Sequence, residues 1–134
     1  NERPMTVKEA FGIKPLRSDL PHEKEIQQNS IVKYCWERCK YGESLSLYNP
    51  NGNLYTIRKI NPNASCPTIN TFKINLMHYD KCRCLHQSEV LRLQTFPEDY
   101  QINNQTKDGY YIAGMSVPPL MMRAIAEQIK EQWF

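Results

Sequence analysis

The chain has 134 residues, and formal net charge is only +3. Apolar residues make up 40% of it, and mean hydropathy is −0.65, so one modest domain or a piece of a larger protein is expected. No apolar run approaches the ~20 residues needed to cross a bilayer and no signal-type start is present, so we expect a soluble, cytoplasmic protein without a membrane partner.

Two capped helices are predicted in the first third. Thr6-Val7-Lys8-Glu9 is a capping-box pattern that opens a short helix ending at Gly12. Residues 14–30 are polar and interrupted by prolines, and they are predicted to form a connector. Ser30 can cap a second helix over residues 31–41, with Gly42 at its stop.

The middle third is predicted to be extended. The runs LSLY (45–48) and LYTIRKI (54–60) flank an Asn51-Gly52 pair, which is a strong hairpin signal. A third run, CPTINTFKINLMHY (66–79), is expected to join or neighbour that hairpin. These runs predict a small, irregular, β-rich lobe, and with the helices on either side they give an α+β fold class.

Positive charge is concentrated in this part of the chain. Between Lys33 and Arg83 there are eight basic residues and three acidic ones, a local charge of +5, so the remainder carries −2. Such a surplus is a weak sign of a polyanionic partner such as nucleic acid, and a solvated surface is the alternative.

The last third is predicted to be helical again. His86 and Glu89 occupy the capping positions of a helix that runs to about Gln94 and ends before Pro97. A short apolar segment, YYIA (110–113), leads to Pro118-Pro119, where the last helix should begin. One face of that helix carries Leu120, Met122, Ile125, Ile129 and Trp133.

The entrance to the last helix is Gly114-Met115-Ser116. A glycine-containing turn at a helix start can be a place where backbone amides meet a ligand, and a plain loop-to-helix junction is the alternative. The five cysteines, an odd number, argue for a reducing compartment. Neither the CxxxC nor the CxC spacing suits zinc, so we expect no metal site.

Two blocks near the C-terminus together resemble one family. Arg83-x-Leu85 with Glu89, followed by RLQTFPEDY (92–100) and then by YIAGMSVPP (111–119), is similar to the last two conserved blocks of DNA cytosine-5 methyltransferases. Residues 41–45, 58–62 and 67–71 look like the variable target-recognition region of that family. The order of the blocks makes the resemblance far more specific than either block alone.

The resemblance implies a C-terminal piece of a larger α/β methyltransferase. Residues 1–29 would be a connector with a short helix, 30–81 a target-recognition lobe, and 82–134 a helical segment that returns to the catalytic domain. The family's cofactor loop and Pro-Cys nucleophile lie upstream, so no residue here is assigned as catalytic. Because the first residue is Asn1 rather than methionine, we expect a processed, trimmed or excised chain. The resemblance implies an excised fragment or the small subunit of a split enzyme, and without the nucleophile we expect it to be inactive alone.

The resemblance also implies partners and site residues. The partners would be double-stranded DNA and the catalytic N-terminal part, with S-adenosyl-L-methionine as cofactor. The residues implied for the cofactor are Gly114, Met115 and Ser116. Those for DNA are Thr68, Ile69, Arg58, Lys59, Lys40 and Lys73, whereas Arg83, Glu89 and Arg92 would have structural roles.

Two positions depart from the family pattern: Met115 replaces an asparagine and His86 a threonine. A non-catalytic DNA-binding remnant or a regulatory module is therefore kept as the alternative function.

Overall fold

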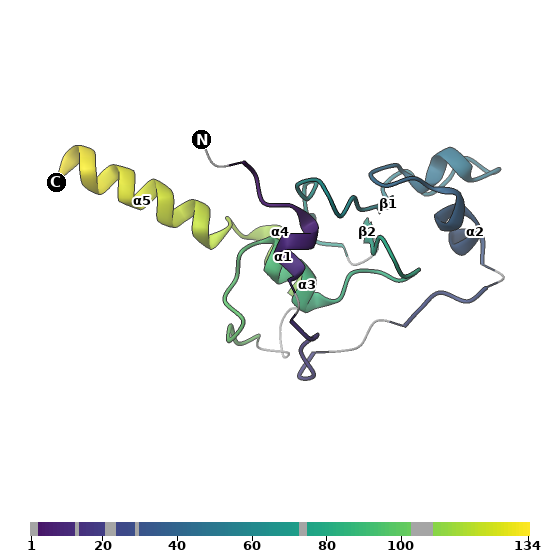
Figure 1. Ribbon diagram of the computed structural model, residues 1–134, viewed down its shortest axis with the longest axis horizontal. Coiled ribbons are helices and arrows are strands. Elements are labelled where there is room, and N and C mark those ends of the chain that lie inside the picture. The colour runs from purple at the N-terminus through teal and green to yellow at the C-terminus, as the bar shows by residue number, and fades with distance from the viewer. Residues whose placement is uncertain (1–2, 13, 21–23, 29, 73–74, 103–108) are drawn as a thin grey trace.

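A computed structural model describes residues 3–12, 14–20, 24–28, 30–72, 75–102 and 109–134 of the chain. Figure 1 shows three parts along the long axis. Helices α1, α3 and α4 gather in the centre, strands β1 and β2 lie with helix α2 at one end, and helix α5 projects from the other. Helices and a small sheet together confirm the expected α+β class.

The helical centre consists of α1 (Val7–Phe11), α3 (Gln87–Leu93) and α4 (Gly109–Met115), and α3 packs against both others. The centre has its own apolar core, because each helix places a few apolar side chains inward. The buried members include Val7, Phe11, Leu85, Val90, Leu91, Tyr110 and Ala113.

The capping predictions are confirmed at three helix starts. The Thr6 hydroxyl accepts the amide hydrogen of Glu9, and Gly12 ends α1 with a φ of +58°. The Ser30 hydroxyl accepts from the Lys33 amide at the start of α2 (Ile31–Arg38). His86 caps α3. Helix α2 ends at Arg38, three residues before the predicted end, because the backbone of Cys39 is already extended.

The predicted hairpin is wrong in its strands, although Ser44 and Arg58, at the two ends of the segment, do form an antiparallel bridge. Residues Leu45–Tyr48 form a 3-10 helix, η1, whose first turn is capped by the Ser44 hydroxyl. Leu54 has a φ of +74°, a conformation that interrupts an extended strand. Only Arg58–Lys59 remains as strand β1, and it pairs in parallel with β2 (Leu76–Met77), with Arg58 opposite Leu76.

A second apolar cluster joins this sheet to the α2 region and η1. Its buried members are Cys35 and Cys39 from the α2 region, Leu45 of η1, and Ile57, Met77 and Cys82. Short irregular segments can keep a fixed shape here because they share this cluster.

The C-terminal helix α5 (Pro119–Trp133) begins where the sequence predicts. Its first turn is fastened to the end of α3, because the Thr95 hydroxyl accepts the Leu120 amide hydrogen at 3.1 Å. Beyond that turn the helix projects away from the centre (Figure 1), and no residue of α5 is buried. No helix within the described residues is long and apolar enough to cross a membrane.

Candidate functional site

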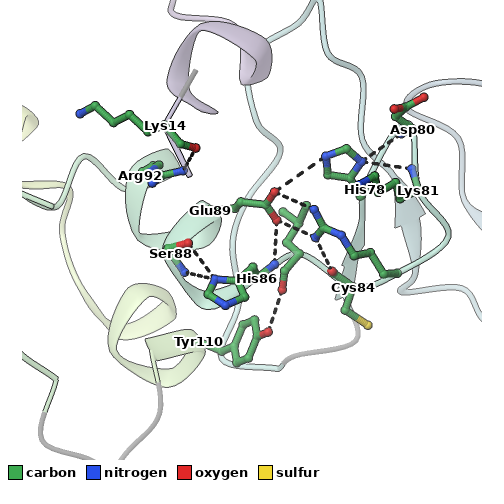
Figure 2. Close-up of polar contacts among 12 residues, drawn as sticks. Lys14, His78, Asp80, Lys81, Cys84, His86, Ser88, Glu89, Arg92 and Tyr110 are labelled. Atoms are coloured by element: carbon green, nitrogen blue, oxygen red, sulfur yellow. Dashed lines mark hydrogen bonds and ion pairs between the residues drawn. The ribbon is translucent and has the colours of Figure 1, made fainter. Parts of the chain in front are cut away.

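A buried ion pair lies at the start of α3. Arg83 donates to both carboxylate oxygens of Glu89, at 2.8 and 2.9 Å, and also to the carbonyl of Cys84. Glu89 in turn accepts the amide hydrogen of His86 at 2.8 Å. Figure 2 shows the carboxylate of Glu89 and its hydrogen bond from the backbone of His86. Burial opposes ionisation of Glu89, but the hydrogen bonds and charge of Arg83 more than offset it and hold the Glu89 pKa below its usual value.

His86 fits this arrangement although threonine was expected there. Its Nδ1 atom accepts the amide hydrogen of Ser88 at 3.1 Å, as a hydroxyl oxygen would at a helix start. The ring is fully buried next to Ser88 (Figure 2). The substitution therefore keeps the helix cap.

His78 also lies close to the carboxylate of the Arg83–Glu89 ion pair. Its Nε2 atom lies 3.8 Å from Glu89, and its Nδ1 atom accepts the amide hydrogens of Asp80 and Lys81, as Figure 2 shows. The ring stacks on Tyr79 with 4.4 Å between centroids. Burial lowers the pKa of His78, and the nearby Glu89 carboxylate opposes part of that shift.

Arg92 fastens the N-terminal connector to α3. Its guanidinium pairs with Glu98 at 2.7 and 3.0 Å and donates to the carbonyls of Lys14 and Pro15. Each of the three residues expected to be structural, Arg83, Glu89 and Arg92, thus takes part in an ion pair.

An open hollow brings together residues that the sequence assigned to different sites. Thr68 and Ile69, expected to contact DNA, line it together with Gly114 and Ser116, expected to contact the cofactor. The hollow has a volume of about 420 Å³, and its wall is completed by Cys66, Pro67, Leu93 and Gln94. Sequence analysis did not single out Gln94, whose amide donates to the Ala113 carbonyl at 2.7 Å and joins α3 to α4.

The expected glycine-containing turn at the start of the last helix is wrong. Gly114 and Met115 are the last two residues of α4, and the amide of Ser116 donates to the Ala113 carbonyl. The turn that precedes α5 is formed by residues 116–118, and the Ser116 hydroxyl donates to the Ile112 carbonyl. The amide and hydroxyl hydrogens of Ser116 are therefore both engaged within the chain.

Gly114 instead allows a close approach between α4 and a loop. A Cβ atom at this position would lie 2.5 Å from the carbonyl carbon of Asn70 and 2.6 Å from the amide nitrogen of Thr71. Real Cβ atoms do not approach backbone this closely. A glycine directly after the predicted apolar segment 110–113 is the signal that could have indicated this packing.

Met115 is the last residue of α4. Its side chain is 66% exposed at the end of α4. It is therefore available to a partner that this chain alone does not supply.

The basic residues assigned to DNA are in three situations. Lys40 and Arg58 are exposed, and Arg58 donates to the Gly42 carbonyl at 3.1 Å. Lys59 is only 8% exposed, with its ammonium group 3.9 Å from the centroid of the Trp36 ring. Burial lowers the Lys59 pKa. Lys73 lies outside the described residues.

Four of the five thiols have a raised pKa. Burial raises the pKa of Cys66 to about 12 and that of Cys82 to about 11, and it also raises the pKa values of Cys35 and Cys39. A nucleophilic cysteine needs a lowered pKa. Among the described residues, no group of three or more His, Cys, Asp or Glu side chains could hold a metal ion.

Comparison with known proteins gives a family match over almost the whole chain. Residues 2–131 match the family described as C-5 cytosine-specific DNA methylase. The chain is 28% identical over 137 residues to a protein of Methanocaldococcus jannaschii named as a type II methyltransferase, M.MJ0563P, in an alignment that covers 97% of this chain and 43% of that protein.

Two further relatives are similar over shorter stretches. Type II methyltransferase M1.HphI of Haemophilus parahaemolyticus is 29% identical over 78% of this chain and 27% of its own length. Type II methyltransferase M.AquIB of Picosynechococcus is 30% identical over 58% of this chain and 64% of its own length. The chain thus spans less than half the length of the first two relatives. No solved structure shows a significant similarity to it.

Proposed function

The chain belongs to the family of C-5 cytosine-specific DNA methylases, and from this membership we propose that it is the C-terminal part, or a separate small subunit, of a DNA cytosine-5 methyltransferase. In this proposal residues 30–81 recognise DNA and residues 82–134 return to the catalytic part. Residues 1–29 connect the catalytic part to residues 30–81. The observation that carries the proposal is the hollow shared by Thr68, Ile69, Gly114 and Ser116. A methyltransferase must bring the target base and the methyl donor to one place.

We assign the contacts with the DNA backbone to exposed lysine and arginine side chains of residues 30–81. Lys40 and Arg58 belong to neighbouring segments, because the Arg58 guanidinium donates to the carbonyl of Gly42, two residues after Lys40. Exposed lysine and arginine side chains suit phosphate contacts, whereas Lys59 is buried against Trp36 and suits packing. Thr68 is exposed and Ile69 is half-buried at the hollow, where a flipped cytosine would be accommodated.

The residues of the hollow suit one edge of an S-adenosyl-L-methionine pocket. The Ser116 hydroxyl oxygen and the Gln94 side-chain carbonyl can accept hydrogen bonds there, but no charged side chain lines the wall. A cofactor that carries two cations and a carboxylate needs more than this edge. When bound, it supplies the methyl group for C5 of cytosine. The catalytic part would hold most of it.

We also assign the nucleophile to the missing part. Attack on C6 of cytosine requires a thiolate, and the raised thiol pKa values make Cys66 and Cys82 unsuitable. The match leaves more than half of M.MJ0563P outside the aligned region, because it covers 43% of that protein. The corresponding part here would pack on the exposed apolar face of α5, which includes Ile125, Ile129 and Trp133.

The proposal is tested by methyl transfer. The purified chain is incubated with labelled S-adenosyl-L-methionine and a cytosine-rich duplex, alone and together with the remainder of the enzyme. We expect label in DNA only when both parts are present. Incorporation by the chain alone would contradict the assignment of the nucleophile to the missing part, and no incorporation with both parts would contradict the proposed activity.

A non-catalytic DNA-binding remnant is the second candidate, and Met115 favours it because a thioether replaces the amide expected beside the cofactor. It predicts duplex binding without methyl transfer even in the presence of the remainder. The same incubation, read by gel shift as well as by label, separates the two candidates.

A further inference from the structure

A protrusion formed by residues 44–57 has a composition unlike its surroundings. It contains no Lys, Arg, Asp or Glu over its whole length, although Lys40 precedes it and Arg58 and Lys59 follow it. Instead it is rich in amides and hydroxyls: it contains three asparagines (Asn49, Asn51 and Asn53), three serine or threonine residues and two tyrosines. An uncharged segment between cations is suited to contacts other than ion pairs.

The two ends of the protrusion are held together by hydrogen bonds and by apolar packing. The Leu45 amide donates to the Ile57 carbonyl at 2.9 Å, and both side chains are buried in the second apolar cluster. The Ser44 hydroxyl caps η1 and also donates to the Tyr55 carbonyl at 3.0 Å, so one side chain joins the two ends. Recognition segments on such fixed supports bind with less loss of conformational entropy.

The outer part of the protrusion leaves polar groups available. Asn51 and Asn53 are exposed, and within the described residues no hydrogen bond engages either side-chain amide. Tyr55 and Leu47 are also prominent, at 71% and 67% exposed. In Figure 1 this blue segment lies at the end of the molecule opposite to α5.

We propose that residues 44–57 read base edges in the major groove, with Asn51 and Asn53 as specificity-determining residues; this inference rests on the proposed function. An asparagine amide can donate to and accept from the major-groove edge of adenine at the same time, and an exposed leucine such as Leu47 can contact a thymine methyl group. The flanking Lys40 and Arg58 would hold the backbone phosphates, which carry no sequence information.

The experiment maps methylated cytosines. The complete methyltransferase that contains this chain is incubated with plasmid DNA, and bisulfite sequencing gives the bases around each methylated cytosine. For Asn51→Ala or Asn53→Ala we expect discrimination at one or more flanking positions to fall by roughly ten- to a hundredfold. For Lys40→Ala and Arg58→Ala we expect less methylation at every site and a weaker salt dependence, with the sequence context kept.

Gln28→Ala is the matched control, because this amide is exposed and lies outside residues 30–81. The bases around the cytosines that this variant methylates should be those of the wild type. The inference is overturned if the asparagine variants methylate cytosines in the same sequence context as the wild type. It is also overturned if they lower methylation equally at all sites, as the loss of a protein–protein contact would. Absence of methylation by the wild-type enzyme would instead count against the proposed function.

Discussion

Glu89 accepts hydrogen bonds from both terminal nitrogens of Arg83, although neither side chain is more than 9% exposed. Removing one partner of such a pair leaves the other charge buried and uncompensated. We therefore expect Glu89→Gln to lower the free energy of unfolding by about 3–5 kcal/mol, measured by urea titration. The exposed Arg123–Glu127 pair is the control, and Glu127→Gln should have no measurable effect. Wild-type stability of the Glu89→Gln chain would contradict the importance of the pair.

Gly114→Ala should destabilise the chain because the new methyl group would lie 2.5–2.6 Å from the backbone of Asn70 and Thr71. Overpacking of this kind costs about 1–3 kcal/mol. Met115→Ala is the control: Met115 is the next residue and is 66% exposed, so this variant should change stability little. Thermal or urea unfolding compares the two variants. Equal stability would show that the loop moves aside without loss.

Stability should fall as pH is lowered from 7 through the ordinary histidine range. The folded pKa of His78 lies below its ordinary value of 6.5, so the unfolded chain binds the proton first as pH falls. The loss attributable to one proton cannot exceed about 1.4 kcal/mol per pH unit. The Glu89 contribution is lost only at lower pH, below the usual carboxyl value of 4.5.

His78→Asn separates this contribution from others. The asparagine side-chain oxygen can accept the amide hydrogens that Nδ1 accepts from Asp80 and Lys81, but it does not titrate. The free energy of unfolding, plotted against pH between 5 and 7, should have a smaller slope for the variant. An unchanged slope would assign the pH dependence to other groups.

Met115→Asn should strengthen cofactor binding if position 115 faces the S-adenosyl-L-methionine site in the complete enzyme. A regained hydrogen bond contributes about 0.5–1.5 kcal/mol, or roughly a three- to tenfold gain in affinity. Calorimetric titration of the complete enzyme measures it, and Met115→Leu is the control. Unchanged affinity for Met115→Asn would show that this side chain does not face the cofactor.

Ile129→Ser should leave the stability of this chain unchanged, because Ile129 is 49% exposed on a helix without buried residues. Leu91→Ala, by contrast, removes a side chain that is only 3% exposed and should cost about 2–5 kcal/mol. In the complete enzyme Ile129→Ser should weaken association with the catalytic part, measured by analytical ultracentrifugation or by protection from proteolysis. Equal association of variant and wild type would contradict the docking proposed for α5.

The helix starts could be predicted because their signals are local. Thr6, Ser30 and His86 each cap the helix expected from the following residues, and Pro119 starts α5. The hairpin prediction failed because the Ser44 cap winds the preceding run into a 3-10 helix, although residues 49–52 do form a turn. Local turn chemistry therefore indicated a turn in this segment but not the structure on either side of it.

The site was predictable only in part, because tertiary contacts decide the rest. Helix α4 was missed since Gly109 and Gly114 lie near its ends, and only the approach to the Asn70 backbone explains Gly114. Lys59 was expected on the surface like most lysines, but Trp36 provides a ring and a carbonyl for its ammonium group. Neither contact leaves a periodic signal in the sequence.

Helix α5 has 15 residues and buries none of them, so packing within this chain does not stabilise it. An isolated helix of about this length is marginal in water. For the docking proposed above, helix formation and association would then be thermodynamically linked. Part of the association free energy would go into suppressing the helix–coil equilibrium of α5, and the heat-capacity change would report apolar burial together with that ordering.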